Sequence, residues 1–206
     1  MKLPEELLEF YNKNKSKIKK RLKEFSLVPK EEYFYELCYC LLTPQSKAEN
    51  SVLVVQKLKQ MDFFINDFDP KPILIEPKHY IRFHNNKAKH LLYAKEIFPQ
   101  ILECIENNNS LHEKRMFLVN KVLGFGMKES SHFLRNIGFK NLAILDRHIL
   151  KNLVLCGVID SYPNSLNKFT YLNIEKKFLY FAERINIPID ELDLLFWSVQ
   201  TGQILK

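Results

Sequence analysis

Apolar residues recur along this chain at intervals of three and four, which is the spacing of one face of an α-helix. The first such stripe consists of Leu7, Leu8, Phe10, Tyr11, Ile18, Leu22 and Phe25. Lysines between Lys13 and Lys23 cover the other face, and we interpret them first as a solvated face and only second as a DNA contact. Sustained alternation with a period of two, which would indicate strands, is absent.

The same periodicity predicts helices along the rest of the chain. The expected ranges are 31–42, 47–59, 88–106, 111–123, 129–137, 147–155, 169–185 and 189–204. We expect a break near Pro99, because proline removes a backbone donor, and joints at Pro163 and Pro188. The predicted fold class is therefore all-α, with no internal repeat.

Composition adds limits to this fold. The 206 residues are 46% hydrophobic and 13% aromatic, which is typical of a globular protein with one domain or two small lobes. The four cysteines, Cys38, Cys40, Cys104 and Cys156, have neither the paired spacing of a zinc site nor that of an iron–sulfur cluster. We therefore expect reduced core cysteines, no metal and no cofactor.

Charge points to the kind of partner. The 31 Lys and Arg exceed the 24 Asp and Glu by seven, which favours a polyanionic partner bound in a salt-sensitive manner. No apolar run reaches the roughly 18 residues of a membrane span, and the first residues lack the apolar core of a signal peptide. We expect an intracellular protein with no membrane partner.

A glycine pair separates two of the predicted helices. Gly124 and Gly126 flank one apolar residue in the segment from Lys121 to Lys128, and the pattern resembles a helix-hairpin-helix motif. Glycines let the backbone turn tightly, so amides at the start of the second helix can point at a DNA phosphate. The alternative is an ordinary turn between helices, since such a glycine pair is common.

Two charged residues make the first interpretation stronger. Lys128 stands two residues after Gly126, and Asp146 follows 146 − 128 = 18 residues later. This spacing resembles that of the helix-hairpin-helix DNA glycosylase superfamily. The resemblance implies that Lys128 attacks the sugar carbon bearing a damaged base and that Asp146 supports the positive charge that develops there.

The chemistry accounts for these residue types, although each has a plainer role. A lysine is nucleophilic only when neutral, so a nearby carboxylate would oppose its deprotonation. A fixed carboxylate in a site with little water stabilises an oxocarbenium-like sugar. The alternatives are an exposed first-turn lysine at Lys128 and a helix N-cap at Asp146, and the N-cap is compatible with catalysis.

Over nearly the whole chain, the sequence resembles the archaeal-type second class of 8-oxoguanine DNA glycosylase and abasic-site lyase. Residues 36–48 look like a segment that enters the DNA, with Gln45 filling the gap of the flipped base, although Thr43 and Pro44 could merely end a helix. Residues 79–88 are similar to a segment whose aromatic residue, here Phe83, lies against that base. A core position for Phe83 is the alternative.

The end of the chain carries the most class-specific resemblance. Residues 131–138, 192–197 and 201–206 match the class, which implies that Trp197 stacks on the base and that the terminal carboxylate of Lys206 meets it. An acceptor there would favour 8-oxoguanine, which carries a hydrogen on N7 where guanine has a lone pair. Asp193 is a further candidate for a hydrogen bond to the edge of the base. The alternative is an exposed aspartate, which is the commoner outcome. Leu123 departs from the wider superfamily, which often has proline there.

The resemblance implies two helical lobes with a DNA-binding cleft between them: residues 29–139 with the hairpin, and residues 1–28 with 140–206. It further implies a monomer that binds double-stranded DNA, excises 8-oxoguanine through a lysine Schiff base and cleaves the abasic site without metal or cofactor. One rival is the same fold acting on another lesion. The other is a non-catalytic module, in which alanine at Lys128 and Asp146 would leave function intact.

The proposed carboxylate acceptor gives a first prediction. Deletion of Lys206, or a C-terminal tag, should slow excision of 8-oxoguanine more than cleavage of a pre-formed abasic site, since only the first step discriminates the base. Both rates are measured on otherwise identical duplexes. Equal loss in both rates would contradict this role and favour a general effect on DNA binding.

Overall fold

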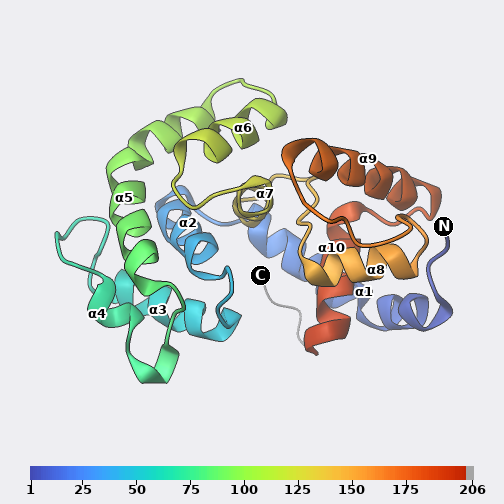
Figure 1. Ribbon diagram of the computed structural model, residues 1–206, viewed down its shortest axis with the longest axis horizontal. Helices are drawn as coiled ribbons and strands as arrows, with labels where there is room; N and C mark the ends of the chain where they lie inside the picture. The colour runs from blue at the N-terminus through green and yellow to red at the C-terminus, as the bar shows by residue number, and fades with distance from the viewer. Residues whose placement is uncertain (203–206) are drawn as a thin grey trace. The chain divides into compact units, whose positions relative to one another are not determined.

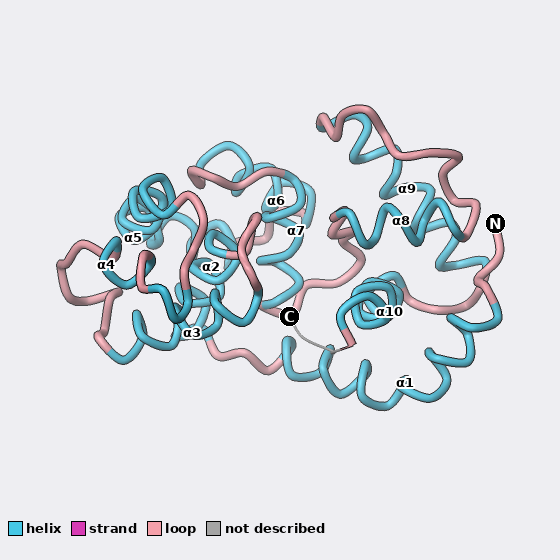
Figure 2. Tube along the Cα trace, turned by 60° about the horizontal axis from the view of Figure 1, so that its bottom comes forward, coloured by secondary structure: helices cyan, strands magenta, loops and turns pink. Residues whose placement is uncertain are grey.

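The computed structural model describes residues 1–202, without the side chain of Thr201 (Figure 1). Its chain divides into two compact units, residues 29–133 and residues 1–28 with 134–206. Every regular element in the described part is a helix, so the prediction of an all-α fold is confirmed (Figure 2).

The unit of residues 29–133 consists of the helices between Lys30 and Lys121 and the start of α7. They are η1 (Lys30–Glu32), α2 (Tyr33–Leu42), α3 (Ala48–Gln60), α4 (Lys71–Leu74), η2 (Pro77–His79), α5 (His84–Glu106), α6 (Leu111–Lys121) and α7 (Met127–Asn136). Helix α2 packs against α3 and the long α5, and α6 returns along α5 (Figure 1). An aromatic cluster fills this core: Phe34 lies 5.3 Å from Phe98 and 6.1 Å from Phe63, ring centre to ring centre.

The other unit joins the two parts of the chain. It consists of α1 (Glu5–Ser26), the end of α7, α8 (Arg147–Leu155), α9 (Lys168–Arg184) and α10 (Ile189–Thr201). Helix α10 packs against α1, α8 and α9, and its Phe196 stacks on Phe178 of α9 at 5.9 Å. The α1 residues that are buried, Leu7, Tyr11, Ile18 and Phe25, belong to the predicted stripe.

Local sequence explains where several helices begin. Ser110 and Glu113 form a reciprocal capping box at the start of α6, and the Asn167 side chain caps α9. Helix α10 follows Pro188 and ends at Gly202, whose φ of 73° is the left-handed conformation that glycine adopts readily. Among residues 1–202, no helix is long and apolar enough to span a membrane.

Several details of the helix prediction were wrong. Helix α5 begins at His84 rather than at residue 88. Helix α5 continues through Pro99 instead of breaking there, because apolar contacts of its buried face on both sides of the proline outweigh one lost backbone bond. Helix α7 begins at Met127 rather than at Glu129. The short α4 was missed, since four residues are too few to show periodicity.

A buried hydrogen bond between the ends of the chain gives a second prediction. The Tyr11 hydroxyl of α1 donates to Glu191 Oε2 of α10 at 2.6 Å, and Glu191 is buried. Tyr11→Phe should lower the free energy of unfolding by about 1–3 kcal/mol, since a buried carboxylate loses its donor. Urea unfolding measures this change. Tyr180→Phe, at an exposed tyrosine of the same unit, is the control, and equal effects of the two variants would contradict the explanation.

Candidate active site

The predicted hairpin connects α6 to α7 by a tight turn. The Phe125 amide donates to the Val122 carbonyl at 3.1 Å, and Gly124 lies at a φ of 88°. A Cβ atom at Gly124 would stand 2.4 Å from His90 Nδ1 on α5, closer than real Cβ contacts. Glycine is therefore required here both for the backbone conformation and for the approach to α5.

The second glycine stands directly before α7, and its amide already has an acceptor. The Gly126 N–H donates to Glu129 Oε2 at 3.2 Å. The glutamate in the third position of α7 thus accepts a hydrogen bond from the residue directly before the helix. The sequence predicted that hairpin amides face a phosphate. For the Gly126 amide, such a contact requires the Glu129 side chain to turn away.

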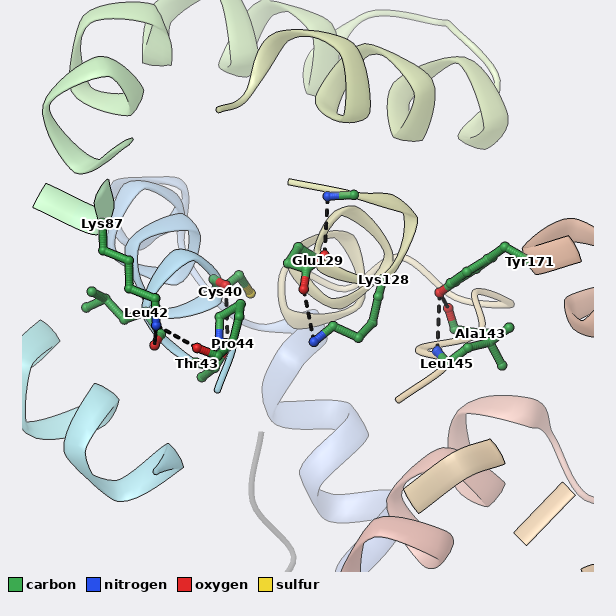
Figure 3. Close-up of polar contacts among 11 residues, drawn as sticks. Cys40, Leu42, Thr43, Pro44, Lys87, Lys128, Glu129, Ala143, Leu145 and Tyr171 are labelled. Carbon is green, nitrogen blue, oxygen red and sulfur yellow. Dashed lines mark hydrogen bonds and ion pairs between the residues drawn. The ribbon is translucent and has the colours of Figure 1, made fainter. Parts of the chain in front are cut away.

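Lys128 is the second residue of α7, and its ammonium group pairs with the same glutamate. Lys128 Nζ lies 2.9 Å from Glu129 Oε1, and about a third of the lysine side chain is exposed (Figure 3). Glu129 thus contacts both the hairpin amide and the candidate nucleophile. The lysine must therefore leave this ion pair before its nitrogen can reach a substrate.

A second lysine of this unit was missed by the sequence analysis. Lys87 on α5 is only 5% exposed, and its Nζ donates to the Leu42 and Pro44 carbonyls at 2.6 and 2.7 Å (Figure 3). Burial lowers the pKa of Lys87 to about 8, and the charges of Lys128 and Arg82 contribute. Its position on the buried face of α5, four residues before Leu91, was the signal that could have identified it.

Gln45 and Phe83 share an uncommon backbone conformation. Both lie in the left-handed region, at φ values of 57° and 59°, and both are exposed. Phe83 is 52% exposed with the Arg82 guanidinium 5.7 Å from its ring centre, so the alternative of a core phenylalanine is wrong. Helix α2 does end at Leu42, so Thr43 and Pro44 terminate a helix, and Gln45 follows in the turn.

Asp146 is the N-cap of α8, which is the structural role that the sequence offered beside catalysis. Its Oδ1 accepts the backbone N–H groups of His148 and Ile149, both at 2.8 Å. The segment before it is fixed by α9, because the Tyr171 hydroxyl donates to the Ala143 carbonyl at 2.6 Å and accepts the Leu145 amide at 3.2 Å (Figure 3). Tyr171 was missed by the sequence analysis, which predicted only a helix over residues 169–185.

Three further candidates belong to the last helix or follow it. Asp193 is 5% exposed, and its Oδ2 lies 3.8 Å from the Arg135 guanidinium. The alternative prediction of an exposed aspartate is therefore wrong. The pKa of Asp193 is raised to about 7, chiefly by burial; the charge of Arg135 opposes this shift, and the carboxylates of Asp146 and Asp190 add to it. Trp197 follows one turn later and is half-buried. Lys206 lies outside the described residues.

The structure thus groups the candidates within each unit. In residues 29–133, Lys87 contacts the turns of both Gln45 and Phe83: its side chain donates to the Pro44 carbonyl before Gln45, and its backbone N–H donates to the Phe83 carbonyl. The charge of Lys128 contributes to the lowered pKa of Lys87. In the other unit, the charge of Asp146 contributes to the raised pKa of Asp193. Among the described residues, no three His, Cys, Asp or Glu side chains gather as a metal ion would require, and the four cysteines are buried and form no disulfide.

Comparison with known proteins extends over nearly the whole chain. A family model described as 8-oxoguanine DNA glycosylase matches residues 18–187. The 8-oxoguanine DNA glycosylase/AP lyase of Fusobacterium nucleatum is 41% identical over 211 residues, covering 98% of this chain and 96% of that protein. The enzyme of the same name from Methanocaldococcus jannaschii is 36% identical, with 92% and 91% covered.

Solved structures agree with these relatives. The crystal structure of the Methanocaldococcus jannaschii 8-oxoguanine glycosylase/lyase, in complex with a 15mer DNA containing 8-oxoguanine, matches with a TM-score of 0.84 at 34% identity, covering 97% of each chain. The 8-oxoguanine DNA glycosylase of Thermotoga maritima matches with a TM-score of 0.86 at 26% identity, covering 98% of this chain and 97% of that one.

Agreement in sequence and fold places this chain among the helix-hairpin-helix DNA glycosylases. Within that class, the chain belongs to the 8-oxoguanine DNA glycosylase family, in its archaeal type, and is a DNA glycosylase with AP lyase activity. The resemblance inferred from the sequence and the predicted enzyme class are thereby confirmed.

The cap geometry of Asp146 gives a third prediction. Asp146→Ala should lower the free energy of unfolding by about 1 kcal/mol, because two amides of α8 lose their acceptor, whereas Asp146→Asn should change it little because asparagine caps equally well. Thermal or urea unfolding of both variants measures the difference. Equal stability of the alanine and asparagine variants would show that the cap contributes nothing.

Proposed function

We propose that this protein removes 8-oxoguanine from duplex DNA and then cleaves the abasic site by β-elimination, with Lys128 as the nucleophile. The observation that carries the proposal is Lys128 in the first turn of α7, directly after the Gly124–Gly126 hairpin. The DNA-bound Methanocaldococcus jannaschii structure, matched over 97% of the chain, supports the choice of lesion. The mechanism and the residue roles are those that the family resemblance implies, and the geometry within each unit supports them.

The first step requires a neutral Lys128 amine. Its ammonium must leave Glu129 Oε1 and give up a proton before the nitrogen can attack C1′ of the sugar. As the N–C1′ bond forms, the bond from C1′ to N9 of the base breaks, and the base leaves with that electron pair and takes up a proton. Opening of the sugar ring then produces the Schiff base.

The second step breaks the DNA strand. The iminium makes the C2′ hydrogen acidic, so loss of that proton and departure of the phosphate from C3′ complete a β-elimination. Water then hydrolyses the Schiff base and regenerates the lysine. Neither step requires an oxidant, a metal or a cofactor.

Asp146 has the electrostatic role. Both of its capping bonds use Oδ1, and among the described residues Oδ2 accepts no hydrogen bond, so the orientation of the carboxylate is set while one oxygen stays available. A carboxylate fixed by backbone amides does not have to reorganise as positive charge develops on the sugar. We propose that Oδ2 stabilises this oxocarbenium-like state.

The remaining candidates bind the extruded nucleotide and its surroundings. In the proposed complex, Gln45 fills the gap in the duplex, Phe83 and Trp197 contact the flipped base, and the Lys206 carboxylate accepts the N7 hydrogen of 8-oxoguanine. Asp193 is the least direct of these candidates, since its carboxylate faces Arg135 in the structure. Gly124 and Gly126 would approach a DNA phosphate.

We further propose that the protein acts as a monomer with two helical lobes, both of which bind duplex DNA. The lobes would be residues 29–139, and residues 1–28 with 140–206, whereas the structure divides its two units after residue 133. The same fold acting on another damaged base is the second candidate function, because the hairpin and its lysine say little about base identity.

Covalent trapping gives a fourth prediction. With borohydride and a duplex containing one 8-oxoguanine, the protein should form a stable adduct, and Lys128→Gln should abolish it because only a primary amine forms a Schiff base. Lys121→Gln, a charge-matched change at the exposed end of α6, should leave trapping unchanged. Asp146→Asn should slow trapping at least about 100-fold, the scale of losing an electrostatic group that acts in the transition state.

Two outcomes would contradict the proposal. Adduct formation by Lys128→Gln would exclude Lys128 as the nucleophile. An adduct with another damaged base, together with none at 8-oxoguanine, would retain the mechanism and change the lesion.

A further inference from the structure

Lys87 is a buried, fully hydrogen-bonded charge of the unit of residues 29–133 for which the proposed reaction has no use. Its ammonium group donates to the Leu42 carbonyl at 2.6 Å, the Pro44 carbonyl at 2.7 Å and Ser46 Oγ at 3.1 Å. These three acceptors surround Gln45 on both sides along the chain. Lys87 therefore holds the Leu42 and Pro44 carbonyls that precede Gln45 in this turn (Figure 3).

The same contacts reach the turn of Phe83. Ser46 Oγ, which accepts from Lys87, also accepts the backbone N–H of Arg82 at 3.1 Å, and the Lys87 backbone N–H donates to the Phe83 carbonyl at 3.0 Å. Asn50 on α3 adds a bond to the Tyr80 carbonyl at 3.0 Å. The Lys87 side chain thus contacts the Gln45 turn directly and reaches the Phe83 turn through Ser46, whereas the bond between Lys87 and Phe83 is a backbone hydrogen bond at the start of α5.

Backbone conformation shows why such a link has consequences. Gln45 and Phe83 both occupy the left-handed region with side chains that disfavour it, and such conformations persist only where neighbouring contacts maintain them. The contacts that flank both residues converge on Lys87 and Ser46. Loss of the link should therefore release both turns together.

We propose that Lys87 is a positioning residue that holds the Gln45 turn and the Phe83 turn in one fixed arrangement, so that filling the gap in the duplex and contacting the flipped base occur together. This inference rests on the roles proposed for Gln45 and Phe83. A simpler role would be to satisfy the last carbonyls of α2, as cations near helix ends do, and it would involve the Gln45 turn alone.

The test compares Lys87→Met and Ser46→Ala with Lys89→Met, a change at an exposed lysine two residues along the same helix. Ser46→Ala removes only the bridge and leaves the two carbonyl contacts of Lys87 in place, which covers the case that Lys87→Met fails to fold. Amide hydrogen exchange of the free protein reports residues 43–46 and 80–83 separately. In both test variants exchange should rise in both segments, and in Lys89→Met in neither.

A kinetic cycle tests the coupling. In the unaltered protein, Gln45→Ala and Phe83→Ala should combine non-additively in single-turnover excision of 8-oxoguanine, by about threefold or more. In the Lys87→Met background the two effects should simply multiply. Lys87→Met itself should slow excision about tenfold, a typical coupling between contacting residues, while cleavage of a pre-formed abasic site stays within about twofold.

The outcomes separate the two proposals. Faster exchange in residues 43–46 alone, or undiminished coupling of Gln45 and Phe83 in the Lys87→Met background, would overturn the positioning role. Absence of 8-oxoguanine excision by the unaltered protein would instead overturn the choice of lesion. The exchange experiment still decides on Lys87 in that case, because it needs no substrate.

Discussion

The turn between α6 and α7 closes because Gly124 presents no side chain to His90, and the position of the proposed nucleophile depends on that close approach. A larger residue would have to displace the His90 ring and would also resist the left-handed conformation. Either change would shift the first turn of α7. Because Lys128 is the second residue of that helix, the hairpin sets the place at which its side chain begins.

The two proposed catalytic charges are held in contrasting ways. Asp146 accepts two backbone N–H groups of a helix start, and α9 fixes the segment that leads to it, so its carboxylate has little freedom. Lys128 is partly exposed and pairs with a side chain, Glu129, that can rotate. This contrast suits the chemistry, since the carboxylate must be preorganised while the lysine must change its protonation state and form a bond.

Periodicity predicted the helical class and most helices, because apolar stripes determine which faces pack. It failed where local rules were overridden, as at Pro99, whose helix is maintained by core packing on either side. The hairpin turn and the Asp146 cap could also be predicted, since glycines and helix caps are local signals, whereas the catalytic roles of Lys128 and Asp146 rest on the family resemblance and stay predictions. The sequence analysis missed Lys87 and Glu129, because their roles arise from contacts with a distant turn and with a backbone amide that spacing alone does not reveal.

The central claim is that the reaction proceeds through the amine of Lys128. Its most direct test is to digest the borohydride-reduced complex with 8-oxoguanine DNA and locate the modified residue by mass spectrometry. The account predicts that the sugar remnant is attached to the Lys128 side chain. Attachment to another amine, such as that of Lys87 or the amino group of Met1, would contradict it.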